Sequence, residues 1–238
     1  MKEVGRIYSY LMSSIEAEYD TVKELKTSER GFVSLLQNKR NGTRLVFRHY
    51  CGNGEVYQKL LGISCPNLPQ IMEVAESDGM VAVLEEYVQG DRLDYLLRDA
   101  LFTPAEARKI TMQLCNALWV LHSLGAVHRD IKPENVIIRG SEAVLIDFNA
   151  SRIFKSECSD DTQILGTTGY AAPEQYGIFQ TDQRADIYSM GILLNIMLTG
   201  KHPSRELASG RLGRIVQKCT MVNPQKRYKN VRALMEAL

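Results

Sequence analysis

"HRDIKPEN" (residues 128–135) places His128, Arg129, Asp130, Lys132 and Asn135 on one short stretch of chain. Polar and charged groups crowded on a turn cost free energy when they are buried, unless each finds a partner. A stretch of this composition is therefore typical of a place where the side chains bind or transform another molecule. The motifs around it indicate which kind.

Three further motifs follow in order: "DFN" at 147–149, "AAPE" at 171–174 and "DIYSMG" at 186–191. Together with "HRDIKPEN" they resemble, in order and near the spacings, the eukaryotic-like serine/threonine protein kinases. The resemblance runs from about Tyr19 to the end of the chain, and "GTTGYAAPEQY" (166–176) is most similar to bacterial members. It implies an α+β, bilobal protein-kinase-like fold with a small β-rich lobe before a helical lobe.

The resemblance assigns a chemical role to four of these side chains. Phosphoryl transfer depends on positioning and charge neutralisation, and the family pattern implies that Asp130 accepts the proton of the attacking hydroxyl. Lys132 would lie beside the transferred phosphoryl group. Asn135 and Asp147 offer oxygen ligands of the kind that Mg²⁺ prefers, so ATP and Mg²⁺ are the implied cofactors. A lone aspartate on a turn is more often structural, but the complete set favours chemistry.

Other matched residues imply a scaffold for this loop. Asp186 is expected to accept hydrogen bonds from the backbone of the loop 128–135. Glu174 is expected to form a buried ion pair with Arg227. Arg129 is expected to pair with a phosphorylated activation segment (147–174). The candidate acceptors in that segment are Ser156, Ser159, Thr162, Thr167 and Thr168. Of these, Thr167 is expected to contact Asp130 rather than to be modified.

The N-terminal part of the chain has two patterns. Val4, Ile7, Leu11 and Ile15 recur at helical spacing, which predicts an amphipathic helix over residues 1–18 that packs on the rest of the protein; binding of a partner is the alternative. From Tyr19 onward the pattern favours strands. It predicts one hairpin from "GFVSLL" and "TRLVFRHY" (31–36 and 43–50) and another turning at 77–79, with "GEVYQKLLGI" (54–63) as the helical exception.

The second half of the chain favours helices. Thr103 and Glu106 form a capping-box pattern around Pro104. The apolar face of this predicted helix consists of Ile110, Leu114, Ala117, Leu118 and Leu121. Further helices are predicted at about 183–199 and 230–238. The predicted organisation is a helical extension (1–18) and a kinase-like domain (19–238) with lobes 19–87 and 88–238.

The phosphate-binding parts of the smaller lobe depart from the family pattern. In "KTSERGFV" (26–33), Gly31 and Val33 remain, but Lys26 and Ser28 replace the first two glycines of the usual loop. Glycine lets backbone amides approach phosphates closely, so the loop is expected to be altered. Arg48 occupies the position of the family's strand lysine, which contacts the α- and β-phosphates. Arginine keeps the positive charge but has a longer, planar head group. We expect Arg48 to contact phosphate or Glu55, the candidate helix glutamate, the alternative being a solvated strand-edge arginine.

The adenine site is the other part that the resemblance implies. "EEYVQG" (85–90) resembles the hinge, and it places Glu85 where the purine pocket begins. Glu85 would pair with Arg48, accept from adenine, or remain a partly solvated charge. Val33, Val46 and Ile137 would sandwich the base. The full set of expected ATP contacts is Leu25, Gly31, Val33, Val46, Arg48, Glu55, Glu86, Val88 and Ile137. Asn149 replaces a family glycine after Asp147-Phe148, and asparagine tolerates the left-handed backbone expected there.

Composition narrows the partners and the compartment. The chain of 238 residues is 45% hydrophobic with a net charge of +1, which argues against a nucleic-acid partner. The charged start "MKEVGRIYSY" does not fit a signal peptide, and no apolar run predicts a membrane span. The cysteines, which show no metal-binding spacing and favour a reducing cytoplasm, are Cys51, Cys65, Cys115, Cys158 and Cys219. Whether two copies form a homodimer is left open.

Three functions are compatible with these residues. The first is an ATP- and Mg²⁺-dependent serine/threonine protein kinase that acts on protein substrates and on itself. The second is a pseudokinase that binds nucleotide or a partner protein without useful turnover; Arg48 and the altered loop favour it, and the complete set around Asp130 opposes it. The third is a small-molecule phosphotransferase, which "GTTGYAAPEQY" opposes. We expect the first.

Overall fold

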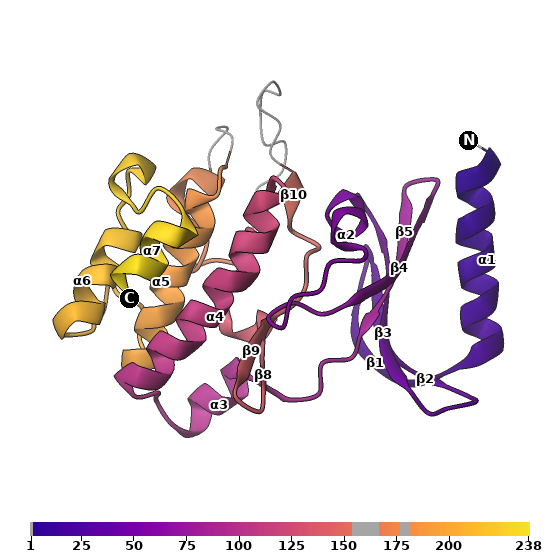
Figure 1. Cartoon of the computed structure of the whole chain (residues 1–238), viewed down its shortest axis with the longest axis horizontal. Helices are drawn as coiled ribbons and strands as arrows, with labels where there is room; N and C mark the ends of the chain where they lie inside the picture. Colours follow the sequence, from indigo (N-terminus) through magenta and orange to yellow (C-terminus); the bar gives the residue numbers. More distant parts are fainter. Residues whose placement is uncertain (1, 154–166, 177–180) are drawn as a thin grey trace. The chain divides into compact units, whose positions relative to one another are not determined.

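Contacts within the chain divide the protein into two units. The computed structural model describes residues 2–153, 167–176 and 181–238. Unit 1 comprises Met1–Cys65 and Pro69–Val88, and unit 2 comprises Pro66–Leu68 and Gln89–Leu238. Figure 1 shows the five-stranded sheet in the first unit, and most of the helices together with several short strands in the second. The chemistry-bearing motifs named above lie in unit 2.

Unit 1 is built on a five-stranded antiparallel sheet in the order β1-β2-β3-β5-β4. Its strands are β1 (Tyr19–Ser28), β2 (Gly31–Asn38), β3 (Arg44–Cys51), β4 (Ile71–Ser77) and β5 (Met80–Glu86). Both predicted hairpins are confirmed, because β2 pairs with β3 and β4 pairs with β5. Asp78 (φ 50°) and Gly79 (φ 76°) both have the left-handed backbone that a two-residue hairpin turn of the primed type requires.

The N-terminal helix α1 (Lys2–Glu18) packs on one face of this sheet, as Figure 1 shows. Its Leu11 and Ile15 join a hydrophobic cluster with Leu45 and Phe47 of β3. Successive side chains of a strand point to opposite faces. The intervening β3 residues, 46 and 48, therefore face the other side of the sheet, away from α1.

The predicted apolar face of α1 was partly wrong. Ile7 is 60% exposed, whereas Tyr8 and Met12 pack against the cluster beside Leu11 and Ile15. The buried face is thus rotated toward the positions one residue after Ile7 and Leu11. Tyr8 also has its hydroxyl oxygen 2.5 Å from Nε2 of His49 on β3, and this polar contact orients the helix on the sheet.

Truncation of α1 at its buried face should destabilise the protein. Leu11 is 2% exposed, and Leu11→Ala is expected to lower the free energy of unfolding by about 2–5 kcal/mol, the usual cost of emptying a core site. Ile7→Ala, in the same helix but exposed, is the matched control and should change it by less than about 0.5 kcal/mol. Equal urea midpoints for the two variants would contradict the packing of α1.

Unit 2 is mainly helical. Its helices are α3 (Leu93–Asp99), α4 (Pro104–Ser123), α5 (Arg184–Thr199), α6 (Gly210–Cys219) and α7 (Val231–Ala237). The capping box of α4 is confirmed, since Thr103 Oγ1 accepts from the N–H of Glu106 and Glu106 reaches back to the N–H of Thr103. The predicted apolar face of α4 is fully buried, and this helix contacts α5 and α7.

Two small sheets in unit 2 position the polar motifs. One has the order β6-β8-β9, with β6 (Asp91–Arg92), β8 (Val136–Arg139) and β9 (Glu142–Leu145), and the other pairs β7 (Ala126–Val127) with β10 (Arg152–Ile153). The loop 128–135 therefore connects the end of β7 to the start of β8, and Asp147 follows shortly after β9. Within the described residues, no helix has the length and apolarity needed to cross a membrane.

Candidate active site

The loop 128–135, called here the catalytic loop, is held through its backbone by Asp186 in the first turn of α5. The carboxylate accepts hydrogen bonds from the N–H groups of His128 (2.9 Å) and Arg129 (2.8 Å). Its Oδ2 also lies 2.8 Å from Nε2 of His122 on α4. Burial raises the pKa of Asp186. The hydrogen bond to His122 and the electrostatic interaction with it lower this pKa by more than burial raises it, so the pKa lies below the ordinary value. The ionised carboxylate thus serves the structural role that the sequence predicted.

Asp130 is the centre of a closed set of polar contacts. Its Oδ2 lies 2.8 Å from Nζ of Lys132, and its Oδ1 accepts a hydrogen bond of 2.7 Å from the hydroxyl of Thr167. Lys132 Nζ also donates to Thr167 Oγ1 at 2.6 Å. Burial raises the pKa of Asp130, but the bonds from Lys132 and Thr167 outweigh it and lower the pKa below its usual range. The carboxylate is ionised and accepts a hydrogen bond from a hydroxyl group.

Asn135 connects Asp130 to the strand that leads to Asp147. Its Nδ2 donates to the backbone carbonyl of Asp130 (2.8 Å) and to Oδ2 of the same residue (3.0 Å). Its backbone carbonyl accepts from the N–H of Ile146 at 2.9 Å. These bonds set the spacing between the catalytic loop and the segment that begins at Asp147.

The left-handed backbone of this segment is at Asp147 (φ 69°), and not at Asn149 as the sequence suggested. The N–H of Asn149 donates to Oδ1 of Asp147 at 3.3 Å. Aspartate tolerates this conformation because its short polar side chain can bond locally. The next residue, Phe148, is buried and packs edge-on against His128. Asp147 is therefore held at a defined point beside the catalytic loop.

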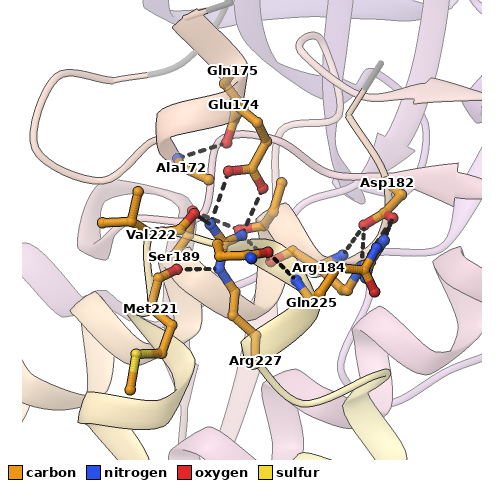
Figure 2. A network of polar contacts seen from close by, with 12 residues as sticks. Ala172, Glu174, Gln175, Asp182, Arg184, Ser189, Met221, Val222, Gln225 and Arg227 are labelled. Carbon is orange, nitrogen blue, oxygen red and sulfur yellow. Dashed lines mark hydrogen bonds and ion pairs between the residues drawn. The ribbon is translucent and has the colours of Figure 1, made fainter. Parts of the chain in front are cut away.

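An ion pair joins Glu174, whose side chain is 15% exposed, to the buried Arg227, as Figure 2 shows. Arg227 donates to both carboxylate oxygens of Glu174, at 2.6 and 2.8 Å. It also donates to the carbonyls of Arg184, Met221 and Val222. All five N–H donors of the guanidinium thereby have acceptors. This arrangement ties the end of the activation segment to the start of α5 and to residues 221–222.

Gln175 is a site residue that no sequence pattern predicted. Its side chain bonds the backbone of both the activation segment and the catalytic loop, through Ala172 and Arg129. His122 was missed as well. A glutamine after "APE" and a histidine late in a helix carry no signal in one sequence, because their roles arise from contacts with residues far away in the chain.

In unit 1, Arg48 forms a buried ion pair with Glu85. Its Nε lies 2.7 Å from Oε1 of Glu85, and the two residues are 5% and 2% exposed. The pairing considered for Glu85 is therefore confirmed. A solvated strand-edge arginine and a partly solvated glutamate are both wrong. Arg48 and Glu85 lie on neighbouring strands, β3 and β5. The residue directly opposite Glu85 is Val46, so Arg48 is its diagonal neighbour, two residues along β3 on the same face of the sheet.

Gly31 has a structural requirement for glycine in β2. Its φ is 147°, and a Cβ at this position would lie 2.1 Å from the carbonyl oxygen of His49. The glycine is thus needed for the close approach of β2 to β3. The two-residue turn at 29–30, between Ser28 and Gly31, connects β1 to β2.

The remaining predicted residues fall on both units. Glu55 begins α2 (Glu55–Leu60), and Leu25 on β1 is largely exposed. The others of unit 1 are Val33, Val46, Glu86 and Val88, and Ile137 lies on β8 of unit 2. In the activation segment, Thr168 is exposed. Thr162, Ser156 and Ser159 lie outside the described residues.

Comparison with known families places this site in context. The family model described as "Protein kinase domain" matches residues 23–237 of this chain. Serine/threonine-protein kinase D of Synechocystis is 28% identical over 84% of this chain and 44% of its own length. Serine/threonine-protein kinase pkn2 of Myxococcus xanthus is 33% identical over 60% of this chain and 18% of its own length. The probable serine/threonine-protein kinase PknB of Corynebacterium glutamicum is 37% identical over 51% and 20%.

The chain thus spans less than half the length of these curated relatives. The family model nevertheless covers both units, including β2 to β5, the catalytic loop and the Glu174–Arg227 pair. By this match and by the arrangement around Asp130, the chain belongs to the protein kinase family.

Proposed function

We propose that this chain transfers the γ-phosphoryl group of ATP to serine or threonine hydroxyl groups of protein substrates, and to its own hydroxyl groups as well. The observation that carries the proposal is the contact of Asp130 with Thr167 and Lys132. A carboxylate that already accepts a hydrogen bond from a threonine hydroxyl suits a substrate that presents the same group. The names of the curated relatives support the same assignment.

Each side chain of this arrangement has a proposed role. Asp130 orients the attacking hydroxyl and accepts its proton. Lys132, beside Asp130, neutralises charge on the transferred phosphoryl group. Thr167 holds the two side chains in register through its hydroxyl. The lowered pKa of Asp130 keeps its carboxylate available as a proton acceptor at neutral pH.

The residues near Asp130 fit a Mg²⁺ ion bound together with nucleotide. Both bonds made by Asn135 Nδ2 go to Asp130, so Oδ1 is the atom of that amide that would bind the metal. Asp147 adds a carboxylate. Among the described residues, no group of three or more His, Cys, Asp or Glu could hold a metal ion. Two protein oxygens with phosphate and water completing the shell are usual for Mg²⁺, which when bound neutralises phosphate charge.

The ATP contacts remain those expected from the sequence, with Arg48 as the proposed phosphate ligand of unit 1. Its charge lies on the sheet face opposite α1, which it shares with Val46. The reducing cytoplasm is the compartment that we propose, because the buried Cys115 and Cys219 are free thiols.

The direct test is incubation of the purified chain with labelled ATP, Mg²⁺ and a generic protein substrate, followed by phosphoamino-acid analysis. We expect labelled phosphoserine or phosphothreonine, and no label when EDTA removes the metal. A thermal shift with ATP but no transfer would favour the pseudokinase alternative. Label on a small acceptor molecule alone would contradict the protein-substrate assignment.

Removal of the Arg48 charge should weaken ATP binding. We expect Arg48→Met to raise the dissociation constant for ATP about tenfold, the equivalent of about 1.4 kcal/mol. Because this variant leaves Glu85 buried without its ion pair to Arg48, stability will fall too. The double variant Arg48→Met/Glu85→Met removes both charges and separates the two effects. Isothermal titration should show weak binding in both variants; wild-type affinity in the double variant would mean that Arg48 is not an ATP ligand.

A further inference from the structure

Gln175 bridges two segments through its side-chain amide. It lies in the 3-10 turn Pro173–Tyr176 and is 1% exposed. Its Nε2 donates to the carbonyl oxygen of Arg129 at 2.9 Å, and its Oε1 accepts from the N–H of Ala172 at 3.0 Å. Figure 2 shows the second of these bonds beside the Glu174–Arg227 pair.

The two backbone partners determine the orientation of this amide. A carbonyl oxygen can only accept and an N–H group can only donate, so Nε2 must face Arg129 and Oε1 must face Ala172. A side chain with only acceptors, or with neither group, cannot satisfy both. Among ordinary side chains of this length, the primary amide therefore satisfies both groups without a change of protonation state.

The Arg129 residue that Gln175 holds has an unfavourable backbone conformation. Its φ is 70°, which an arginine adopts only at a cost. Asp186 binds its N–H group at 2.8 Å, and Gln175 binds its carbonyl oxygen. The peptide unit that follows Arg129 leads directly to Asp130. One clamp on each side of Arg129 thus sets the direction in which the Asp130 side chain leaves the backbone.

We propose that Gln175 is a positioning residue, which holds the left-handed Arg129 and thereby keeps Asp130 aligned with the segment that begins at Thr167. Thr167 and Gln175 are then two ties between the catalytic loop and residues 167–176, one through the side chain of Asp130 and one through the backbone before it. The consequence for catalysis rests on the proposed function; the effect on the loop does not.

Two substitutions test this side-chain amide. Gln175→Met keeps the approximate size of the side chain but removes both the Nε2 donor to the Arg129 carbonyl and the Oε1 acceptor for the Ala172 N–H. Gln175→Glu keeps the acceptor for the Ala172 N–H but, when ionised, places a carboxylate oxygen against the carbonyl oxygen of Arg129. We expect kcat to fall about 10- to 100-fold in both, since small displacements of a reacting group have effects of this size. The KM for ATP should change less than about twofold. The matched control is Gln217→Glu, the same change on the exposed side of α6.

The dependence of kcat on pH separates positioning from loss of fold. A protonated glutamic acid has one O–H donor, and burial raises the pKa of a carboxyl group. The kcat of Gln175→Glu relative to wild type should therefore rise as the pH falls from about 8 to about 6. All rates are measured well below the unfolding midpoint of each variant, so that each value refers to folded protein.

Amide hydrogen exchange tests the clamp without any activity. The N–H groups of His128 and Arg129 should exchange faster in Gln175→Met than in wild type or in Gln217→Glu. Unchanged exchange in these two residues, or a kcat within twofold of wild type, would overturn the proposal. If wild type transfers no phosphoryl group, the proposed function fails, and the exchange result still decides whether Gln175 holds the loop.

Discussion

Asp130→Asn should lower the rate of phosphoryl transfer by about 10³-fold, because a positioned general base contributes 10²- to 10⁴-fold. Asparagine fills the same space and can still accept a hydrogen bond from Thr167. It cannot take the proton of the substrate hydroxyl, and it has no charge to hold Lys132, which lies 2.8 Å from Oδ2 in the wild type. Initial rates with labelled ATP and Mg²⁺ measure the effect.

The matched control is Asp99→Asn, the same substitution at an exposed carboxylate in the last turn of α3. Its rate should equal that of wild type. ATP binding, followed as a thermal shift, should persist in Asp130→Asn, since that residue is assigned to the hydroxyl and not to the nucleotide. Equal rates for wild type and Asp130→Asn would show that the measured transfer does not use this site.

The second large effect is expected at Arg227. Arg227→Met removes five hydrogen bonds and leaves Glu174 without its ion pair to Arg227 in a mostly buried place. We expect the free energy of unfolding to fall by about 3–5 kcal/mol, the usual cost of breaking a buried pair by removing one partner. Arg227→Lys should lose less stability, because its ammonium group keeps the charge and has three donors. It should still be less stable than wild type, since two of the five acceptors lose their hydrogen bond to this side chain.

Urea denaturation distinguishes this network from an ordinary surface pair. Arg232 of α7 pairs with Glu236 at 3.4 Å, and its side chain is 71% exposed. Arg232→Met should change the free energy of unfolding by less than about 1 kcal/mol. The expected order of stability is wild type and Arg232→Met, then Arg227→Lys, then Arg227→Met. If Arg227→Met were as stable as Arg232→Met, the pair would not stabilise the attachment of the activation segment to α5 and to residues 221–222.

Several elements could be predicted from local sequence because their cause is local. The capping box at Thr103 needs only a glutamate three residues later, and the turn at Asp78-Gly79 needs only residues that tolerate left-handed backbone. The buried face of α4 follows from apolar residues at helical spacing. The prediction of the buried face of α1 was wrong at Ile7. This helix has apolar residues on two adjacent stripes, and the contacts with the sheet determine which stripe is buried.

By itself, the sequence determined the family, the two-part organisation and the identity of the residues around Asp130, because motif order survives without any knowledge of contacts. Only the tertiary structure decided that Arg48 pairs with Glu85, that Gly31 is required by the carbonyl of His49, and that Gln175 reaches Arg129. These facts join residues 18 to 46 positions apart. The physical reason is that a buried charge or amide takes whichever partner the fold brings within about 3 Å, and that partner leaves no periodic or local trace in the chain.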